Sequence, residues 1–238
     1  MRLMVLEKPI DGHVHLGYSI PAEEILNQMK ISDVEKAVVF ALPAEVGYDA
    51  DMNSYVLSEA ERTGVFIPFY YMLDDLKLPE NIEKFRGIKW HWVRGAPHYR
   101  SNMKLLHEPR LIDLAQRLAE LKLPVIMEED LAFTKEFVRL ADEVILIIPH
   151  LGLLGGSPRE FLEAFKEYEN VYFDTALAAK WDTEHFYREI GADRLIFGSD
   201  IPFGYMKSEL AKVLTADIPE EDVKKITREN ILKLTGLR

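Results

Sequence analysis

Short apolar runs alternate with amphipathic segments along the whole chain. Most of these runs are apolar on both faces, which is typical of strands buried between two layers of a parallel sheet. The first run ends at His13-Val14-His15, and later runs predict strands at 37–42, 65–73, 87–92, 124–129, 144–149, 171–175 and 195–198. Pro68 lies inside the third strand and lacks a backbone N–H, so weaker pairing is expected there.

The segments between the runs carry helix signals. The clearest helix is predicted at 108–121, where leucines and an alanine recur on one face. Ser157-Pro158-Arg159-Glu160 marks another helix start, with an N-cap serine, a proline at the first helical position and a glutamate at the third. Further helices are predicted from residue 21, at 52–62, 79–85, 133–141 and 183–190, and in the tail at 208–214, 220–226 and 229–234.

Eight strands that alternate with helices predict an α/β fold with parallel strands. The chain has 238 residues, close to the roughly 250 that are typical of a (β/α)₈ TIM barrel. No linker or low-complexity segment divides it, so a single domain over 1–238 is expected. An open doubly wound sheet is the alternative, but it predicts a glycine-rich phosphate loop after the first strand, where His13-Val14-His15 stands instead.

Composition narrows the function classes. Lys plus Arg number 29 against 40 Asp plus Glu, and the resulting formal charge of −11 argues against a nucleic acid or an anionic membrane as partner. The sequence contains no cysteine, so any metal must take histidine and carboxylate ligands. The apolar part of 1–8 is too short for a signal peptide, and no stretch approaches the ~20 apolar residues of a membrane span. A cytoplasmic protein is expected.

The candidate functional residues lie at the ends of the predicted strands. In a (β/α)₈ barrel the carboxyl ends of the strands meet at one mouth, which carries the active site. Histidines one residue apart, as at 13 and 15, point to the same side of a strand. The ionisable groups at the strand ends are His13, His15, Lys89, His91, Glu128, Glu129, His150, Asp174 and Asp200. Any one of them alone is explained as a cap or a hydrogen-bonding group, whereas their joint placement indicates a metal site.

Six segments carry a resemblance to a known family: 11–15, 87–91, 123–128, 149–152, 194–200 and 229–232. With these motifs the chain resembles the amidohydrolase superfamily, in particular its aminocarboxymuconate-semialdehyde decarboxylase-like branch of metal-dependent TIM-barrel enzymes. The resemblance implies a divalent metal, usually zinc, held by His13, His15 and Asp200. It also implies a further ligand from the middle strands, for which Glu128 and His150 are the candidates.

Glu128 departs from the family, which usually has a histidine at that position. A carboxylate still binds Zn²⁺, Mn²⁺ or Fe²⁺, so the metal site survives the exchange. Glu128 could instead bridge two ions, which leaves one or two ions open. Glu129 is the alternative ligand, because only one of two neighbours on a strand faces the mouth. Lys89 has three readings: a carbamylated bridging ligand, an ion-pair partner of Glu128, or a contact to an anionic substrate group.

The function predicted from these residues is metal-assisted hydrolysis of a small amide, lactone or ester. Asp200 is expected to act as general base and then acid, and His150 as a ligand or an electrophile that stabilises the oxyanion. Lys89 and His91, with Arg94 nearby, are expected to bind a substrate carboxylate.

Two alternatives stay open for the function. The first is a non-oxidative decarboxylase of a small unsaturated or aromatic acid, although several such enzymes have a glutamate in the first motif. The second is a non-catalytic barrel that acts as a binding protein. The expected partner is a small-molecule substrate, and the sequence leaves open whether the chain forms a homodimer.

Overall fold

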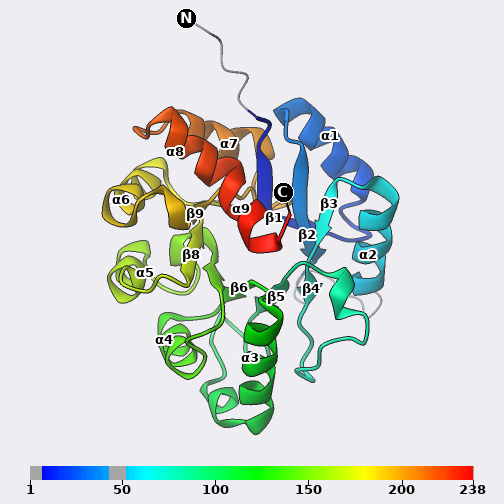
Figure 1. Ribbon diagram of the computed structural model, residues 1–238, viewed down its shortest axis with the longest axis vertical. Coiled ribbons are helices and arrows are strands. Elements are labelled where there is room, and N and C mark those ends of the chain that lie inside the picture. Colours follow the sequence, from blue (N-terminus) through cyan, green and yellow to red (C-terminus); the bar gives the residue numbers. More distant parts are fainter. Residues whose placement is uncertain (1–6, 43–51, 238) are drawn as a thin grey trace, which may run out of the picture.

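The strands of this protein surround a central axis, and the helices lie outside them (Figure 1). The computed structural model describes residues 7–42 and 52–237. Most of the segment 1–8, where the sequence predicts no signal peptide, therefore lies outside the described residues. The strands are β1 (Ile10–Leu16), β2 (Lys36–Ala41), β3 (Phe66–Pro68), β4 (Tyr70–Tyr71), β5 (Ile88–His91), β6 (Val125–Glu128), β7 (Leu146–Ile148), β8 (Val171–Asp174) and β9 (Leu195–Ile196).

Every paired strand is parallel to its neighbour, and the pairs follow the order of the chain. The ladder is interrupted between β3 and β4, which together form the predicted strand at 65–73. Phe69 lies at this interruption and donates its N–H to Val39 of β2 at 2.9 Å, whereas Tyr70 donates to Gly87, just before β5, at 2.9 Å. One strand thus changes partner after Pro68. With β3 and β4 counted as one strand, the described residues contain the eight strands that the sequence predicts.

The first and last strands are joined by backbone hydrogen bonds. Gly12 donates to the Phe197 carbonyl at 2.8 Å, and His15 donates to the Ile201 carbonyl at 2.9 Å. A Cβ atom on Gly12 would lie 2.6 Å from Cγ2 of Ile196, so only glycine fits where the two strands meet. These contacts confirm the predicted fold, a single-domain (β/α)₈ barrel.

Helices cover the outside of the strands at nearly all predicted positions. They are α1 (Ala22–Ser32), α2 (Met52–Thr63), α3 (Pro109–Leu121), α4 (Leu131–Leu140), α5 (Pro158–Phe165), α6 (Lys180–Ile190), α7 (Met206–Leu214), α8 (Glu220–Lys224) and α9 (Asn230–Thr235). The predicted capping box at Ser157 and Glu160 is present. The helix predicted at 79–85 is wrong, because only a 3₁₀ turn forms at Ile82–Lys84. Turn-forming Asp, Pro and Asn residues occupy much of the connection between β4 and β5 and leave too few residues for a stable helix.

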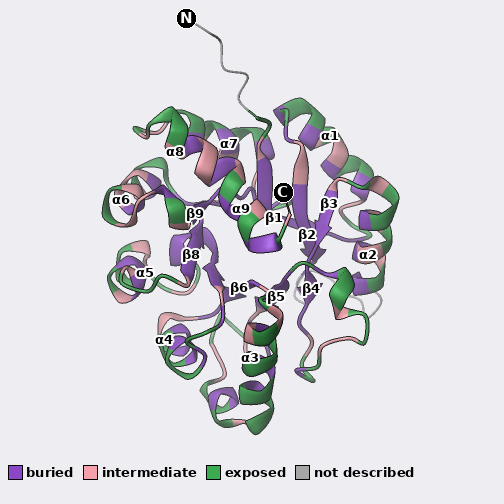
Figure 2. Cartoon of the chain, in the orientation of Figure 1, coloured by how far each residue is buried: buried purple, intermediate pink, exposed green. Residues whose placement is uncertain are grey.

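Two apolar layers follow from the alternation of side chains along the strands. In β2, Val38 and Phe40 point into the barrel, whereas Ala37 and Val39 point toward the helices. The strand residues are buried except for Lys36 and His91, which are partly buried, and the exposed residues lie on the outer helices and the connections (Figure 2). The barrel interior is therefore a packed core.

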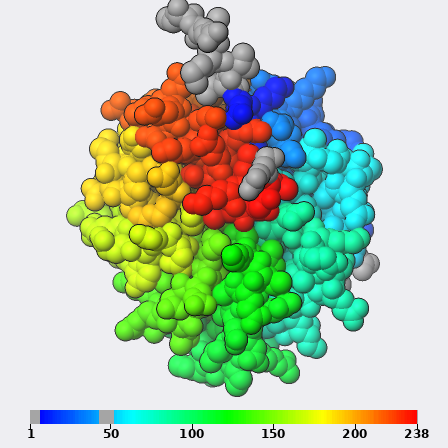
Figure 3. All heavy atoms as spheres, viewed as in Figure 1, coloured from blue at the N-terminus to red at the C-terminus, as the bar shows by residue number. Residues whose placement is uncertain are grey.

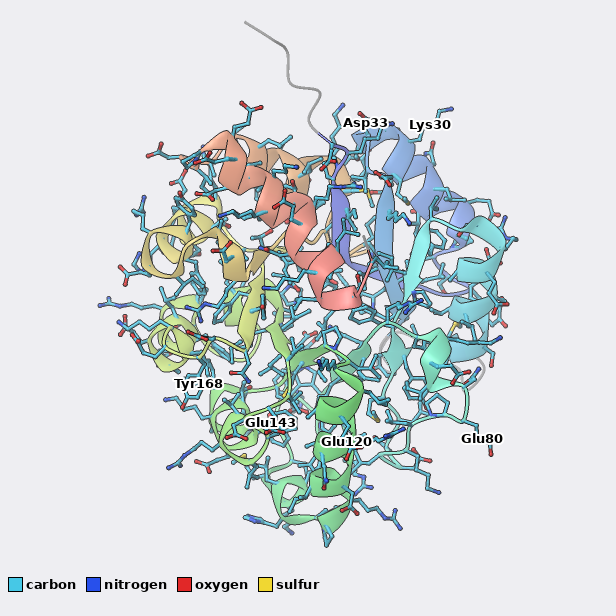
Figure 4. All side chains as sticks on the ribbon, in the orientation of Figure 1. Lys30, Asp33, Glu80, Glu120, Glu143 and Tyr168 are labelled. Carbon is cyan, nitrogen blue, oxygen red and sulfur yellow. The ribbon has the colours of Figure 1, made fainter. Side chains whose placement is uncertain are left out.

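The C-terminal helix closes one end of this interior. Ile231 and Leu234 of α9 pack with Ile10, Ile126 and Ile196, which lie at or near the beginnings of their strands. The red atoms of α8 and α9 cover the middle of the face in Figure 3. Exposed residues such as Asp33 and Glu143, which lie where a helix leads into the next strand, mark the same end (Figure 4). The ionisable groups at the carboxyl ends of the strands therefore lie at the opposite end.

None of the described helices combines the length and the apolar composition that crossing a bilayer requires.

We expect Ile231→Ala to destabilise the protein by about 2–5 kcal/mol, because it removes a fully buried side chain that closes the barrel interior. The matched control is Ile112→Ala, at a helical position that is 52% exposed, where a change within about 0.5 kcal/mol is expected. Urea denaturation of both variants measures the difference. Equal midpoints for the two variants would contradict the closure by α9.

Candidate metal centre

His13, His15 and Asp200 meet at the carboxyl end of the barrel. Both histidines lie on β1, and Asp200 follows β9 with a left-handed backbone (φ 56°). Asp200 Oδ1 lies 3.2 Å from His13 Nε2 and 3.1 Å from His15 Nε2. One ligand atom from each of the three residues lies within 4.8 Å of the others, and all three residues are buried. Among the described residues, this is the group that is able to hold a metal ion.

Hydrogen bonds at the far side of each ring fix the orientation of the histidines. Nδ1 of His13 bonds Asp174 Oδ2 at 2.7 Å, Nδ1 of His15 bonds the Ala41 carbonyl at 3.0 Å, and Nδ1 of His150 bonds the Ala176 carbonyl at 3.1 Å. Carbonyl oxygens only accept, so Nδ1 of His15 and His150 carries the proton and Nε2 carries a lone pair. A histidine that binds a metal typically has its other nitrogen held in this way.

The buried atoms of this group fit a bound cation. Asp200 Oδ1 is buried and has no hydrogen-bond partner, although His15 Nε2 faces it. Two lone pairs that face each other at 3.1 Å repel unless a positive charge lies between them. Ligand atoms on tetrahedral Zn²⁺ lie about 3.3 Å apart when each bond is about 2.0–2.1 Å long. The separations of 3.1 and 3.2 Å therefore suit one ion held by imidazole nitrogen and carboxylate oxygen.

The pKa values of His13, Asp200 and His15 also reflect the close approach of imidazoles and carboxylates. Burial lowers the pKa of His13, and so does Lys89, but Asp174 and Asp200 outweigh them and raise it to about 9. For Asp200, burial acts to raise the pKa, but His13 and His15 hold it below its ordinary value. Burial lowers the pKa of His15. The carboxylates thus keep a positive charge on His13, and a bound cation would take the place of that proton.

His150 and Glu128 approach only part of this group. His150 Nε2 lies 3.9 Å from Asp200 Oδ2 and 3.9 Å from Glu128 Oε1. Glu128 faces the barrel interior, where its Oε2 accepts a hydrogen bond from Lys89 Nζ at 2.8 Å. Glu129 points the other way, and its Oε1 accepts from Trp90 Nε1 at 2.8 Å. Of the two neighbours, Glu128 therefore faces the centre. Its role as a metal ligand and that of His150 stay predictions.

The sequence predicts three positively charged groups at the mouth, but in the structure two of them pair with acidic residues and the third is neutral. Lys89 pairs with Glu128, and Arg94 Nη1 donates to both carboxylate oxygens of Glu108 at 2.6 Å. Burial lowers the pKa of His91 to about 3, so its imidazole is neutral near pH 7. The sequence argument for a carboxylated substrate, which rested on a gathering of positive charge, therefore does not hold in this geometry.

Two further residues shape the centre. Asp174, which the sequence analysis left without a role, links three segments: Oδ2 bonds His13, and Oδ1 accepts from the N–H groups of His150 and Ala176 at 3.0 Å each. Phe40 packs its ring against His13 and His15 with centroids 5.0 and 4.8 Å apart. The position of Asp174 at the end of a strand was a signal for its role, whereas nothing in the sequence distinguished Phe40 from other core residues.

A pocket of about 470 Å³ opens at the ends of β4 and β5. His91 and Tyr71 line it from the ends of β5 and β4, and residues from 72–75 and 92–95 complete it. Of the groups at the strand ends, His91 lines this pocket, and its Nε2 lies 3.8 Å from Glu128 Oε2.

Comparison with known proteins identifies relatives of the chain. A family model described as "Amidohydrolase" matches residues 10–237. No curated protein is significantly similar in sequence. Three solved structures illustrate the likeness in fold.

The first is an uncharacterised TIM-barrel protein from Bordetella bronchiseptica, which is 16% identical with a TM-score of 0.76 and 97% of this chain and 100% of that chain covered. An amidohydrolase from Burkholderia multivorans with bound zinc is 13% identical, with a TM-score of 0.74 and coverage of 98% and 100%. A dihydroxybenzoic acid decarboxylase from Polaromonas sp. JS666 with bound manganese is 14% identical, with a TM-score of 0.74 and coverage of 97% of each chain.

We expect His15→Ala to weaken the binding of Zn²⁺ at least about 100-fold, because it removes one of three converging ligands. His107→Ala, at an exposed position outside this group, is the matched control and should bind like the original chain. Isothermal titration calorimetry on protein stripped with a chelator measures both affinities. Equal affinities for the two variants would place the ion elsewhere.

Proposed function

The chain belongs to the amidohydrolase family, and we propose that it is a metal-dependent hydrolase that acts on a small amide, lactone or ester. The observation that carries this proposal is the convergence of three buried ligand atoms, in which Asp200 Oδ1 faces the Nε2 atoms of His15 and His13 at 3.1 and 3.2 Å. His13, His15 and Asp200 would hold the ion, with His150 as a further ligand. The zinc and manganese bound by the two structural neighbours support a divalent metal.

A divalent ion at this position supplies Lewis acidity, which polarises the scissile carbonyl and acidifies the attacking water. Asp200 has a second carboxylate oxygen, and we assign to it the transfer of the proton from water to the leaving group. The low pKa of Asp200 keeps the carboxylate ionised near pH 7.

The geometry favours a ligand role for His150 over an electrophilic one. An electrophile needs a proton on Nε2 to donate to the developing oxyanion. The hydrogen bond from Nδ1 to the Ala176 carbonyl places the proton on the other nitrogen. In the neutral ring, His150 Nε2 therefore has a lone pair that can bind a metal.

The two residues predicted to bind substrate differ in access. Lys89 has no exposed surface, so its contact with substrate stays a sequence-based prediction. His91 lines the 470 Å³ pocket, and we assign to its neutral imidazole a hydrogen bond to a polar group of the substrate. The cytoplasmic location and the oligomeric state stay predictions as well.

The second candidate function is the non-oxidative decarboxylation of a small unsaturated or aromatic acid. The similarity in fold to the dihydroxybenzoic acid decarboxylase favours this candidate. Asp200 or a histidine of the centre would then deliver a proton to carbon.

We expect Asp200→Asn to lower kcat by about 10²–10⁴-fold, because an amide cannot transfer the proton. Asp217→Asn, at an exposed position, is the control and should keep the full rate. Circular dichroism and metal analysis accompany the assay, so that loss of the fold or of the ion is separated from loss of proton transfer. A folded, metal-loaded Asp200→Asn variant with the full rate would overturn this role.

A substrate panel distinguishes the two candidate functions. With Zn²⁺ or Mn²⁺ supplied, we expect the release of acid from esters and lactones, or from small amides, and no carbon dioxide from aromatic and unsaturated acids. Carbon dioxide release without hydrolysis would favour the decarboxylase. A metal-loaded protein that is inactive on the whole panel would favour the non-catalytic barrel.

A further inference from the structure

Lys89 is a buried cation at the heart of the barrel. Its side chain has no exposed surface, and its Nζ lies 2.8 Å from Glu128 Oε2 and 3.4 Å from His13 Nε2. The ammonium also lies 5.1 Å from the centroid of the Phe40 ring. A buried ammonium is costly unless a carboxylate pairs with it, and here Glu128 is that partner.

We propose that the Lys89 ammonium, held by Glu128, is the built-in second cation of the centre, so that the chain binds one divalent ion and Glu128 is not among its ligands. This inference rests on the proposed metal dependence and deepens it. It assigns a positioning role to Lys89 and Glu128. These two residues lie on the neighbouring strands β5 and β6.

The charges that face the centre balance with one ion. Three carboxylates, those of Glu128, Asp174 and Asp200, supply three negative charges, and Lys89 supplies one positive charge. One divalent ion with neutral imidazole ligands makes the group neutral, whereas a second ion would leave two positive charges in a buried site. The count covers only the carboxylates that contact a side chain of the centre, and Asp11 is left out because its Oδ1 accepts from the backbone N–H groups of His13 and Ser199.

The position of Lys89 also argues against a carbamylated lysine. Carbamylation would replace the ammonium with an anion beside the Glu128 carboxylate, which accepts from Nζ at 2.8 Å. Two like charges this close in a buried site repel strongly. Glu128 would then lose its counter-charge.

Glu128 and His150 both lie outside the group of converging ligand atoms, and Glu128 differs from His150 because it is already paired with a cation. Oε2 is bonded to Lys89, and Oε1 is 3.9 Å from His150 Nε2. The group whose ligand atoms lie within 4.8 Å of one another consists of His13, His15 and Asp200 among the described residues. Glu128 thus serves to hold the ammonium in place beside His13.

The test uses two variants of the full chain that are titrated with Zn²⁺. Lys89→Met with Glu128→Gln removes the ion pair and leaves the net charge of the centre unchanged. Lys89→Met alone removes only the cation. Zn²⁺ per chain is measured by mass spectrometry of the metal, the affinity by calorimetry, and the fold by circular dichroism.

We expect the original chain to hold one Zn²⁺, and the double variant to hold one Zn²⁺ with a Kd within about fivefold of the original. The single variant should take up a second equivalent, or bind the first at least about tenfold more tightly, because the repulsion from Lys89 is gone. Two ions in the original chain, a loss of about 100-fold or more in the double variant, or unchanged binding by the single variant would each overturn the inference.

These outcomes separate the inference from the proposed function. A chain that binds one ion as described but catalyses neither hydrolysis nor decarboxylation contradicts the proposed function alone. A chain that catalyses hydrolysis with two ions, or with Glu128 as an essential ligand, contradicts the inference alone.

Discussion

The hydrogen bonds between β1 and the segment after β9 are the constraint on which the centre depends. Asp200 donates its N–H to the His13 carbonyl at 2.8 Å, and His15 donates to the Ile201 carbonyl at 2.9 Å. These bonds fix the register between β1 and the segment after β9, so that the side chains of Asp200 and both histidines meet. The hydrogen bonds that join β1 to the segment after β9 therefore also position the residues of the centre.

Because these charged groups are buried and held in fixed orientations, they are suited to binding a cation. Asp174 holds His13 from behind, carbonyl groups hold His15 and His150, and Lys89 pairs with Glu128. These partners fix the direction of the side chains around Asp200 Oδ1, which lies where the imidazole nitrogens of His13 and His15 converge. In such a low-dielectric environment a fixed arrangement of this kind binds a cation without reorganising first.

Much of the fold and part of the site could be predicted from the sequence, because both depend on local periodicity. Apolar runs located the strands, and the position of His13, His15 and Asp200 at strand ends predicted their meeting. The change of partner at Phe69 and the 3₁₀ turn at Ile82–Lys84 were not predictable, because they depend on what neighbouring strands offer. The sequence left three interpretations open for Lys89, and the 2.8 Å distance from its Nζ to Glu128 Oε2 could not be predicted from the sequence.

The central claim is that one ion lies between His13, His15 and Asp200. Anomalous diffraction from crystals grown with Zn²⁺ tests it most directly. The account predicts one strong peak about 2.0–2.2 Å from both Nε2 atoms and from an Asp200 carboxylate oxygen. A peak bonded to Glu128 and Lys89, or no peak at the strand ends of a zinc-saturated crystal, would contradict it.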